Sequence, residues 1–486
     1  MYNLHYFTSF FKKNNIVKKK FSFLFYDYET FGLHTRLDKI AQFACIRTDV
    51  NFNIISKPIL IYCTPPLDYL PDPLSIFITK IIPQCTLKKG MNEFFFSKKI
   101  YEEFIKHNTC ILGFNNINFD DEFTRNIFYR NLLDPYGWSY KNNNSRWDLI
   151  NVLRACYVFR PNGIIWPKKK SGLISFKLED IAKCNKIQHL HAHNALSDVY
   201  ATIEIAKLIK NAQPNLFNFF FNHRTKKQLI NLFYKYKYDP IFYVSNIFGS
   251  CNHNVSMIKM ILCSTKNATF LICFDLKYDF SIFLKVFLRV KNFKLEIKKL
   301  FETGLIVIYL NKCPIFAPLN VLDNTSIKKL NINLQKCIKN FVLIDQYIYV
   351  FKEINNFLIQ KKNWNFINNV DLKLYENFFN VSDQKKMEKI HNIYSQKCFI
   401  KNVYFQDYRL NDLFFRMKAR NFFTHLTYSE KKKWYVYCKH VFSIKYIRIY
   451  KKKLNDIFCK NIMNNIDKKI YYKIYDYFLN LIKKFY

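Results

Sequence analysis

The stretch "FSFLFYDYETFG" (residues 21–32) joins an apolar run to two carboxylates, Asp27 and Glu29, which lie two residues apart. In a β-strand, residues i and i+2 point to the same face, so the two acids project together while Tyr26 and Tyr28 point to the opposite face. Carboxylates this close repel each other unless a cation joins them or one is protonated. Alone, however, such a pair more often marks a solvated strand end than a metal site.

A second acidic motif follows in "GFNNINFDDEFTRN" (residues 113–126). A strand is expected to end near its start, and Asp120 then stands at the head of the next helix. Acids are also common at helix N-termini because they cap the helix and complement its dipole. Asp121 and Glu122 compete with Asp120 for any functional role.

A third motif, "HAHNALSDVYAT" (residues 191–202), places His193 five residues before Asp198. Residues i and i+5 do not share one helical face, so we expect His193 on the loop before a helix and Asp198 inside that helix. A loop histidine beside an acidic metal site is suited to accept a proton from attacking water. With His189 and His191 nearby, His193 would not be selected on its own.

The chain of 486 residues carries 76 Lys and Arg against 36 Asp and Glu, a formal net charge of +40. This excess favours a polyanionic partner, most simply nucleic acid. The abundance of Lys, Asn, Ile, Phe and Tyr, which AT-rich codons specify, explains the same charge about equally well without any function. Charge therefore does not decide the function.

Composition excludes several classes of protein. Half of the residues are hydrophobic, which argues against long disordered regions. The 14 cysteines include no CxxC motif and no zinc-site spacing, so we expect neither a disulfide framework nor a zinc site. A reducing cytoplasm is the expected location. No apolar run approaches the ~20 residues of a membrane span, and the N-terminus lacks the pattern of a signal peptide.

Residue patterns divide the chain into three predicted domains. Residues 21–210 alternate strands and helices, which indicates an α/β domain. Residues 214–350 are predicted to be mostly β, from the runs "PIFYVSNIFG", "ATFLICFDL", "GLIVIYLNKCP" and "NFVLIDQYIYVF". Residues 352–486 show helical spacing, with apolar residues four apart from Leu454 to Phe478 among lysines. Such a stripe is compatible with a membrane surface but fits better in a packed helical domain.

The order of D-x-E, N-x₃-F-D and H-x₄-D resembles the DEDDh exonucleases, 3′-to-5′ enzymes with a ribonuclease H-like fold. The match covers Asp27, Glu29, Asn115, Phe119, Asp120, His193 and Asp198. Segments such as "LDKIAQFACIRTD", "NSRWDLINVLRACY", "NKCP" and "LYENFF" extend the likeness to bacterial exodeoxyribonuclease I over nearly the whole chain. That resemblance implies an α/β exonuclease domain with a mixed sheet, an SH3-like β domain and a helical C-terminal domain, closing a basic channel around single-stranded DNA.

The same resemblance implies a chemistry. It is Mg²⁺-dependent hydrolysis of the 3′-terminal phosphodiester of single-stranded DNA to 5′-mononucleotides, in DNA repair and recombination. Two Mg²⁺ ions, with Mn²⁺ as an alternative, would be held by Asp27, Glu29, Asp120 and Asp198, with Asp120 acting partly through water. His193 would be the general base, and Glu29 would also contact the terminal nucleotide.

Substrate contacts are implied at Glu29, Lys177, Arg125, Tyr136, Tyr140, Arg154, Lys226, Asn267 and Asn311. Lys177 stands where relatives carry an arginine, so it keeps the charge but loses bidentate phosphate contact. Arg125 is the best supported of these because it lies one turn past Asp120. Tyr136 and Tyr140 are equally compatible with ordinary packing, and Lys226 with a solvated charge run.

Partners and rival functions complete the expectations. Relatives bind the acidic tail of single-strand-binding protein, in which Arg160 would take part, whereas Asp323 replaces a basic residue in a nearby loop and weakens that prediction. No membrane partner and a monomer are expected. One rival is a 3′-to-5′ exoribonuclease, against which the long C-terminal half argues. Another is a single-strand nucleic-acid-binding protein with a decayed nuclease, against which the filled catalytic positions argue.

Overall fold

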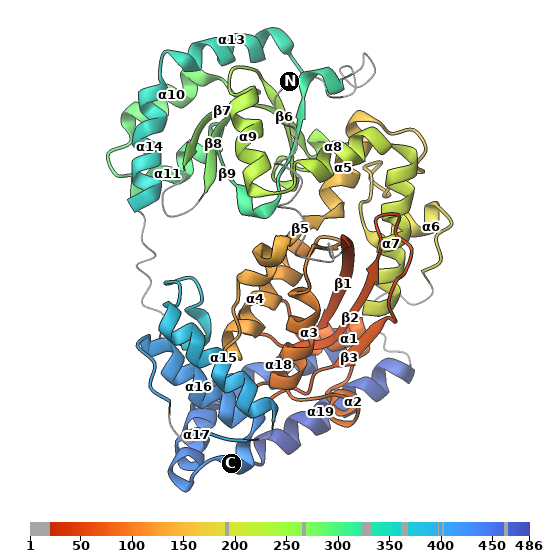
Figure 1. Ribbon diagram of the computed structural model, residues 1–486, viewed down its shortest axis with the longest axis vertical. Coiled ribbons are helices and arrows are strands. Elements are labelled where there is room, and N and C mark those ends of the chain that lie inside the picture. Colours follow the sequence, from red (N-terminus) through yellow and green to blue (C-terminus); the bar gives the residue numbers. More distant parts are fainter. Residues whose placement is uncertain are drawn as a thin grey trace, which may run out of the picture.

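The computed structural model describes residues 20–189, 194–264, 269–322, 330, 332–360, 368–396, 398–400, 403–460 and 465–486. The candidate residues His193, Asn267 and Asp323 lie outside the described residues. The chain forms an α/β unit, a second unit built on a β-sheet, and a helical unit (Figure 1).

A mixed five-stranded sheet forms the centre of the first unit. Its strands are β1 (Ser22–Thr30), β2 (Ile40–Thr48), β3 (Ile59–Tyr62), β4 (Thr109–Gly113) and β5 (Ser145–Asp148). In the order β3-β2-β1-β4-β5, β1 runs antiparallel to β2 and parallel to β4. Every residue of β1 is buried except the half-buried Asp27, so the predicted strand carries its carboxylates into the middle of the sheet.

Helices cover both faces of this sheet (Figure 1). They are α1 (Pro73–Thr79), α2 (Pro83–Lys89), α3 (Glu93–Phe104), α4 (Asp120–Arg130), α5 (Leu149–Phe159), α6 (Leu178–Cys184) and α7 (Ala195–Ala212). Phe23 and Phe25 pack with residues of α5 and α7 on one face. Tyr26 and Tyr28 pack with residues of α3 and α4 on the other. Both faces are covered, which explains why β1 is apolar or aromatic apart from its two acids and its end residues Ser22 and Thr30.

The second unit contains an antiparallel sheet in the order β10-β6-β7-β8-β9. Its strands are β6 (Ile241–Val244), β7 (Val255–Ser264), β8 (Phe270–Asp275), β9 (Leu305–Tyr309) and β10 (Ile315–Pro318). The helices that precede or cover it are α8 (Pro214–Asn222), α9 (Lys226–Tyr236), α10 (Phe280–Arg289), α11 (Phe293–Glu302), α13 (Leu334–Asp345) and α14 (Ile348–Gln360).

One strand prediction in this unit is wrong. The run "NFVLIDQYIYVF" forms the end of α13 and the start of α14 instead of a strand. Its β-branched and aromatic residues favour strands locally, but Ile344, Val350 and Phe351 are fully buried in a core shared with the sheet. Tertiary packing therefore overrides the local propensity.

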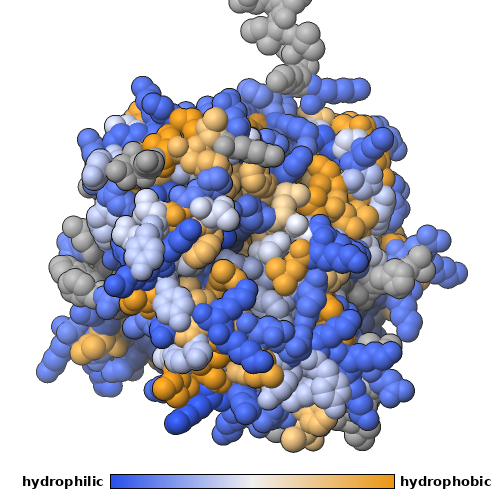
Figure 2. Space-filling view, turned by 90° about the horizontal axis from the view of Figure 1, so that it is seen from below, coloured by the Kyte–Doolittle hydropathy of each residue, from blue (hydrophilic) through white to orange (hydrophobic). Residues whose placement is uncertain are grey.

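The third unit consists of α15 (Val381–Ser395), α16 (Tyr408–Asn421), α17 (Tyr428–Val441), α18 (Ile444–Lys460) and α19 (Asn465–Ile482). Of the apolar stripe predicted from Leu454 to Phe478, Leu454 on α18 and Ile470, Ile474 and Phe478 on α19 are buried in a core shared with the first unit. Phe458 is 37 % exposed, and Ile462 lies outside the described residues. The face seen in Figure 2 is mainly hydrophilic, with scattered apolar areas. Within the described part of the chain, no helix is long and apolar enough to cross a membrane.

A buried cluster of ion pairs joins the helical unit to the α/β unit through Asp68. The Arg420 guanidinium on α16 donates to Asp68, before α1, at 2.8 Å and to Asp371 at 2.6 Å. All three side chains are at most 4 % exposed. Arg416 adds a second ion pair to Asp371 at 3.2 Å. The two units are thus fixed together by charges that solvent does not reach.

Candidate active site

Three carboxylates converge where β1 meets the N-terminus of α7. The ligand oxygens of Asp27, Glu29 and Asp198 all lie within 4.8 Å of one another. Asn194 begins α7 by accepting hydrogen bonds from the backbone N–H groups of Leu196 and Ser197, a standard N-cap. Because α7 packs along β1 and β2, this cap sets its first turn beside the two acids of the strand.

Asp120 reaches the same region from a strand-to-helix turn. β4 ends at Gly113, and Asn115 adopts a left-handed backbone conformation with φ 67°. The Asn115 N–H donates to the Asp148 carboxylate at 2.9 Å, which fixes the turn that starts α4 at Asp120. Asp120 is 5 % exposed and raises the pKa of Asp27 by repulsion, but it stands outside the group of three converging carboxylates.

These acids make the site electrostatically unfavourable without a cation. Burial, followed by the charges of Asp120, Glu29 and Asp198, raises the pKa of Asp27 well above its usual value. Burial and the charge of Asp198 raise the pKa of Glu29 to about 8. A divalent ion that prefers oxygen ligands would relieve this repulsion, so the donor set fits Mg²⁺ or Mn²⁺.

The neighbouring acids Asp121 and Glu122 are committed elsewhere. Asp121 accepts a hydrogen bond from the Tyr26 hydroxyl and forms a buried ion pair with Arg146. Glu122 accepts from Arg125 at 2.8 Å. The sequence did not decide among Asp120, Asp121 and Glu122. Among the described contacts, Asp120 is the one of these three acids that forms no ion pair.

A histidine that the sequence did not select contacts this site. The His189 imidazole Nε2 and the Asp198 carboxylate form a hydrogen bond. His193 lies outside the described residues. Spacing could not indicate His189, because it lies nine positions before Asp198 and outside the H-x₄-D pattern.

The predicted substrate contacts on α4 and after it lie near one another: Tyr136 and Tyr140 line one pocket, and Arg125 contacts Tyr375, whose ring centre is 6.3 Å from that of Tyr136. Arg125 is 7 % exposed, and its Nε has no hydrogen-bond partner among the described residues. Tyr136 is half-buried and donates its hydroxyl to the Leu374 carbonyl at 3.2 Å. Tyr140 is 63 % exposed.

The remaining candidates are more dispersed. The exposed Lys177 pairs with Glu179 at 3.2 Å, and Arg154 donates to Asn151 at 2.7 Å. Lys226 is an exposed first residue of α9.

Asn311 and Arg160 take part in hydrogen bonds between the first and second units. The Asn311 carbonyl accepts from Arg146, and Arg160 donates to the Phe159 and Val321 carbonyls. Arg146 therefore bridges the sheet of the first unit to the second unit, a role that no motif indicated.

Comparison with known proteins accounts for nearly the whole chain. Family models described as "Exonuclease", "Exonuclease I SH3-like domain" and "Exonuclease I C-terminal domain" match residues 24–206, 224–358 and 368–481. Exodeoxyribonuclease I of Buchnera aphidicola subsp. Schizaphis graminum is 48% identical over 465 residues, which cover 96% of this chain and 94% of that protein. This chain belongs to the exonuclease I family.

Solved structures of exonuclease I agree with this assignment. A zinc-bound complex of the Escherichia coli enzyme with single-stranded DNA has a TM-score of 0.88 and 37% sequence identity, covering 96% of this chain and 100% of that one. A structure described as SSB/exonuclease I with an inhibitor has a TM-score of 0.86 and 36% identity, covering 95% of this chain and 100% of that one. The expected three-part exonuclease I architecture is therefore confirmed.

Proposed function

We propose that this protein is a metal-dependent 3′-to-5′ exonuclease that degrades single-stranded DNA to 5′-mononucleotides in DNA repair and recombination. The observation that carries the proposal is the convergence of Asp27, Glu29 and Asp198 within 4.8 Å in a chain of the exonuclease I family. Its α/β unit is followed by two further units, whereas an exoribonuclease of the small kind consists of little beyond the nuclease domain.

Asp27, Glu29 and Asp198 would hold the metal directly, and Asp120 partly through water. Two Mg²⁺ ions, or Mn²⁺, would activate water and stabilise the leaving 3′ oxygen. The raised pKa values of Asp27 and Glu29 support this assignment, because a cation offsets the repulsion that raises them. Glu29 would also contact the terminal nucleotide.

Contacts along the DNA strand are proposed for Arg125, Tyr136 and Tyr140 first, because Arg125 follows Asp120 on α4 and the two tyrosines line one pocket. The other proposed contacts are Lys177, Arg154, Lys226, Asn267 and Asn311. An acidic tail of single-strand-binding protein is a proposed partner, supported by the SSB/exonuclease I structure. All 14 cysteines are free, which supports a cytoplasmic location.

The decisive experiment gives the purified protein matched single-stranded DNA, duplex DNA and RNA, each labelled at the 5′ end, with Mg²⁺ or EDTA. We expect metal-dependent shortening of single-stranded DNA from its 3′ end, and little shortening of the duplex. Equal shortening of RNA would favour the exoribonuclease. Binding without any shortening in Mg²⁺ or Mn²⁺ would indicate a decayed nuclease.

His193 is proposed as the general base, because it precedes the α7 cap residue Asn194 directly. His193→Ala is expected to lower kcat on single-stranded DNA by roughly 10²–10⁴-fold, with little change in KM. His189→Ala is the matched control: His189 holds the Asp198 carboxylate, and we expect it to lower kcat by less than His193→Ala. A larger loss in His189→Ala would transfer the role of base to His189. Both rates are measured by release of mononucleotides at saturating substrate.

A further inference from the structure

A buried glutamine connects the central sheet of the first unit to the helix that carries Asp198. Gln42 lies on β2 directly opposite Glu29 of β1, and it is 1 % exposed. Residues opposite each other on paired strands share one face of the sheet, so Gln42 and Glu29 lie on the same face. The Gln42 Oε1 accepts a hydrogen bond from the backbone N–H of Ala195, the first residue of α7, at 3.0 Å. The sheet and the helix are thus joined beside the converging carboxylates.

This hydrogen bond completes the N-terminus of α7. The first N–H groups of a helix have no partner within the helix itself. Asn194 accepts from the N–H groups of Leu196 and Ser197, and Gln42 accepts from that of Ala195. Ala195 is fully buried, so water does not replace a lost partner there. Removal of the Gln42 oxygen would leave a buried donor unsatisfied, which is costly.

A second partner fixes the orientation of the Gln42 amide. The backbone N–H of Ala195 is only a donor, so the amide must present its oxygen to α7. The Nε2 group then points away from α7 and donates to the Tyr62 hydroxyl at 2.9 Å. Tyr62 lies on the edge strand β3, directly opposite Gln42. A chain of hydrogen bonds therefore runs from β3 across β2 to the first turn of α7.

The position of Ala195 determines that of Asp198. Residues three apart are neighbours on one face of a helix, so a shift of the first turn of α7 moves the Asp198 carboxylate with it. The ligand oxygens of Asp198 and of the two β1 acids lie within 4.8 Å of one another. A metal ion requires its ligand atoms within ~0.2 Å of their ideal distances. A small displacement of α7 would therefore separate the ligands that the strand and the helix supply.

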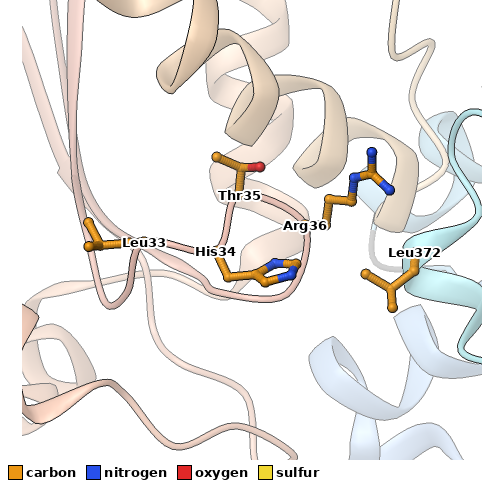
Figure 3. A pocket seen from close by; sticks show the side chains of 5 residues that line it. All are labelled: Leu33, His34, Thr35, Arg36 and Leu372. Atoms are coloured by element: carbon orange, nitrogen blue, oxygen red, sulfur yellow. The ribbon is translucent and has the colours of Figure 1, made fainter. Parts of the chain in front are cut away.

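The loop between β1 and β2 holds these two strands together independently of α7. The Phe31 N–H donates to the Lys39 carbonyl at 2.8 Å, which closes the base of the loop. Figure 3 shows the loop from close by: residues 33–36 line a shallow pocket of ≈ 430 Å³ with Leu372, at the junction of the α/β and helical units. The pairing of the strands is thus fixed by their own connection, whereas the place of α7 depends on contacts such as that of Gln42.

We propose that Gln42 is a positioning residue for the metal ligands: its carboxamide holds the first turn of α7, and with it Asp198, beside the acids of β1. This inference rests on the proposed function, since it concerns the ions that this function requires. Removing an outer residue that orients a metal ligand usually lowers metal affinity by ~10–100-fold. Gln42 therefore contributes to the reaction through the geometry of the carboxylates, without contact with the substrate.

The test measures Mn²⁺ binding to the whole protein without DNA, from the electron paramagnetic resonance signal of free Mn²⁺. Gln42→Met is the informative variant, because methionine is unbranched and has nearly the shape of glutamine, but places a methyl group where glutamine has its oxygen. The Kd for Mn²⁺ is expected to rise about 10-fold. Hydrogen exchange in EDTA gives a reading without metal: the amides of residues 195–198 should exchange faster in Gln42→Met than in the unchanged protein.

Two further variants grade the effect. Gln42→Glu keeps an oxygen that accepts from the Ala195 N–H, so the amides of the first turn of α7 should remain as protected as in the unchanged protein. Tyr62→Phe removes the partner that orients the Gln42 amide, and it should raise both the Kd for Mn²⁺ and the exchange rate by a smaller factor than Gln42→Met.

Asn340→Leu is the matched control in the second unit. Asn340 is also a buried amide, and its oxygen accepts from the first N–H of a helix, that of Phe280 in α10, at 3.3 Å. This variant should lower the stability of the protein without changing the Kd for Mn²⁺ or the exchange of the first turn of α7. An equal loss of Mn²⁺ affinity in Asn340→Leu would overturn the proposal, because it would show a general effect of lower stability.

The proposal requires both changes in Gln42→Met, and it is wrong if either the Mn²⁺ affinity or the exchange rate stays as in the unchanged protein. Should Gln42→Met not fold, Tyr62→Phe takes its place with the same two requirements. Failure of the proposed function is a separate result: the unchanged protein would then not shorten single-stranded DNA in Mg²⁺, whatever the Mn²⁺ affinity of the variants.

Discussion

Replacing Asp27 by asparagine is expected to lower the rate of 3′ hydrolysis by roughly 10³-fold. Asp27 is one of the three converging carboxylates. Charge stabilisation by a bound metal is worth several kcal/mol, and each ~1.4 kcal/mol changes the rate tenfold. Mononucleotide release from single-stranded DNA in saturating Mg²⁺ measures the loss. Glu204→Gln, on the exposed side of α7, is the control and should leave the rate unchanged.

The same substitution should stabilise the protein when metal is absent. The pKa of Asp27 is raised on folding, so at pH values between its unfolded and folded pKa the folded state binds the extra proton. Folding stability therefore falls as the pH rises through that interval. Below the unfolded-state pKa of ~4, Asp27 is protonated in both states and does not destabilise the fold. In EDTA at pH 8, Asp27→Asn should melt at a higher temperature than the unchanged protein, and the difference should vanish near pH 4. A lower melting temperature at pH 8 would refute the proposed repulsion.

Replacing Arg420 by alanine is expected to destabilise the protein by about 3–5 kcal/mol, the usual cost of leaving buried carboxylates without their partner. Although burial opposes ionisation of Asp371, Arg420 and Arg416 hold its pKa well below the usual value. Without Arg420, Asp68 loses its ion-pair partner and Asp371 keeps only the charges of Arg416 and Lys39. The midpoint of urea unfolding at pH 7 measures the effect.

An exposed ion pair between the same two units provides the control. Lys453 on α18 contacts Asp72 at 2.5 Å, with side chains 46 % and 29 % exposed. Lys453→Ala is expected to cost at most ~1 kcal/mol, because solvent screens such pairs. Equal urea midpoints for the two variants would mean that burial of the Arg420 ion pairs adds nothing to the free energy of unfolding.

The site could be located from the sequence because each of its acids lies at the end of a strand or the start of a helix that the sequence pattern predicts. Asp27 and Glu29 follow an apolar strand, Asp120 follows a buried strand, and Asp198 opens an amphipathic helix. Each of these steps is a local pattern, and their order along the chain resembles that of one enzyme family. The fold class followed from the same alternation of strands and helices.

Contacts between distant segments left no such signal. Asp68, Asp371 and Arg420 meet across the junction without any periodic pattern, and Tyr375 reaches Glu122 from a different unit. In the run "NFVLIDQYIYVF", composition favoured strands, but burial against the sheet produced helices. Local propensity describes an isolated segment, whereas these outcomes depend on which surfaces the rest of the chain presents.

The packing of α18 and α19 against the α/β unit bears on how the chain matures during translation. Ile470, Ile474 and Phe478 share a core with Phe31 and with residues of α1. The ribosome makes α1 long before it makes α19, so the growing chain carries an uncovered apolar surface for most of its synthesis. A nascent chain is therefore vulnerable to aggregation until α19 emerges. A stop codon before α19 would release a nuclease domain with part of its core open to water.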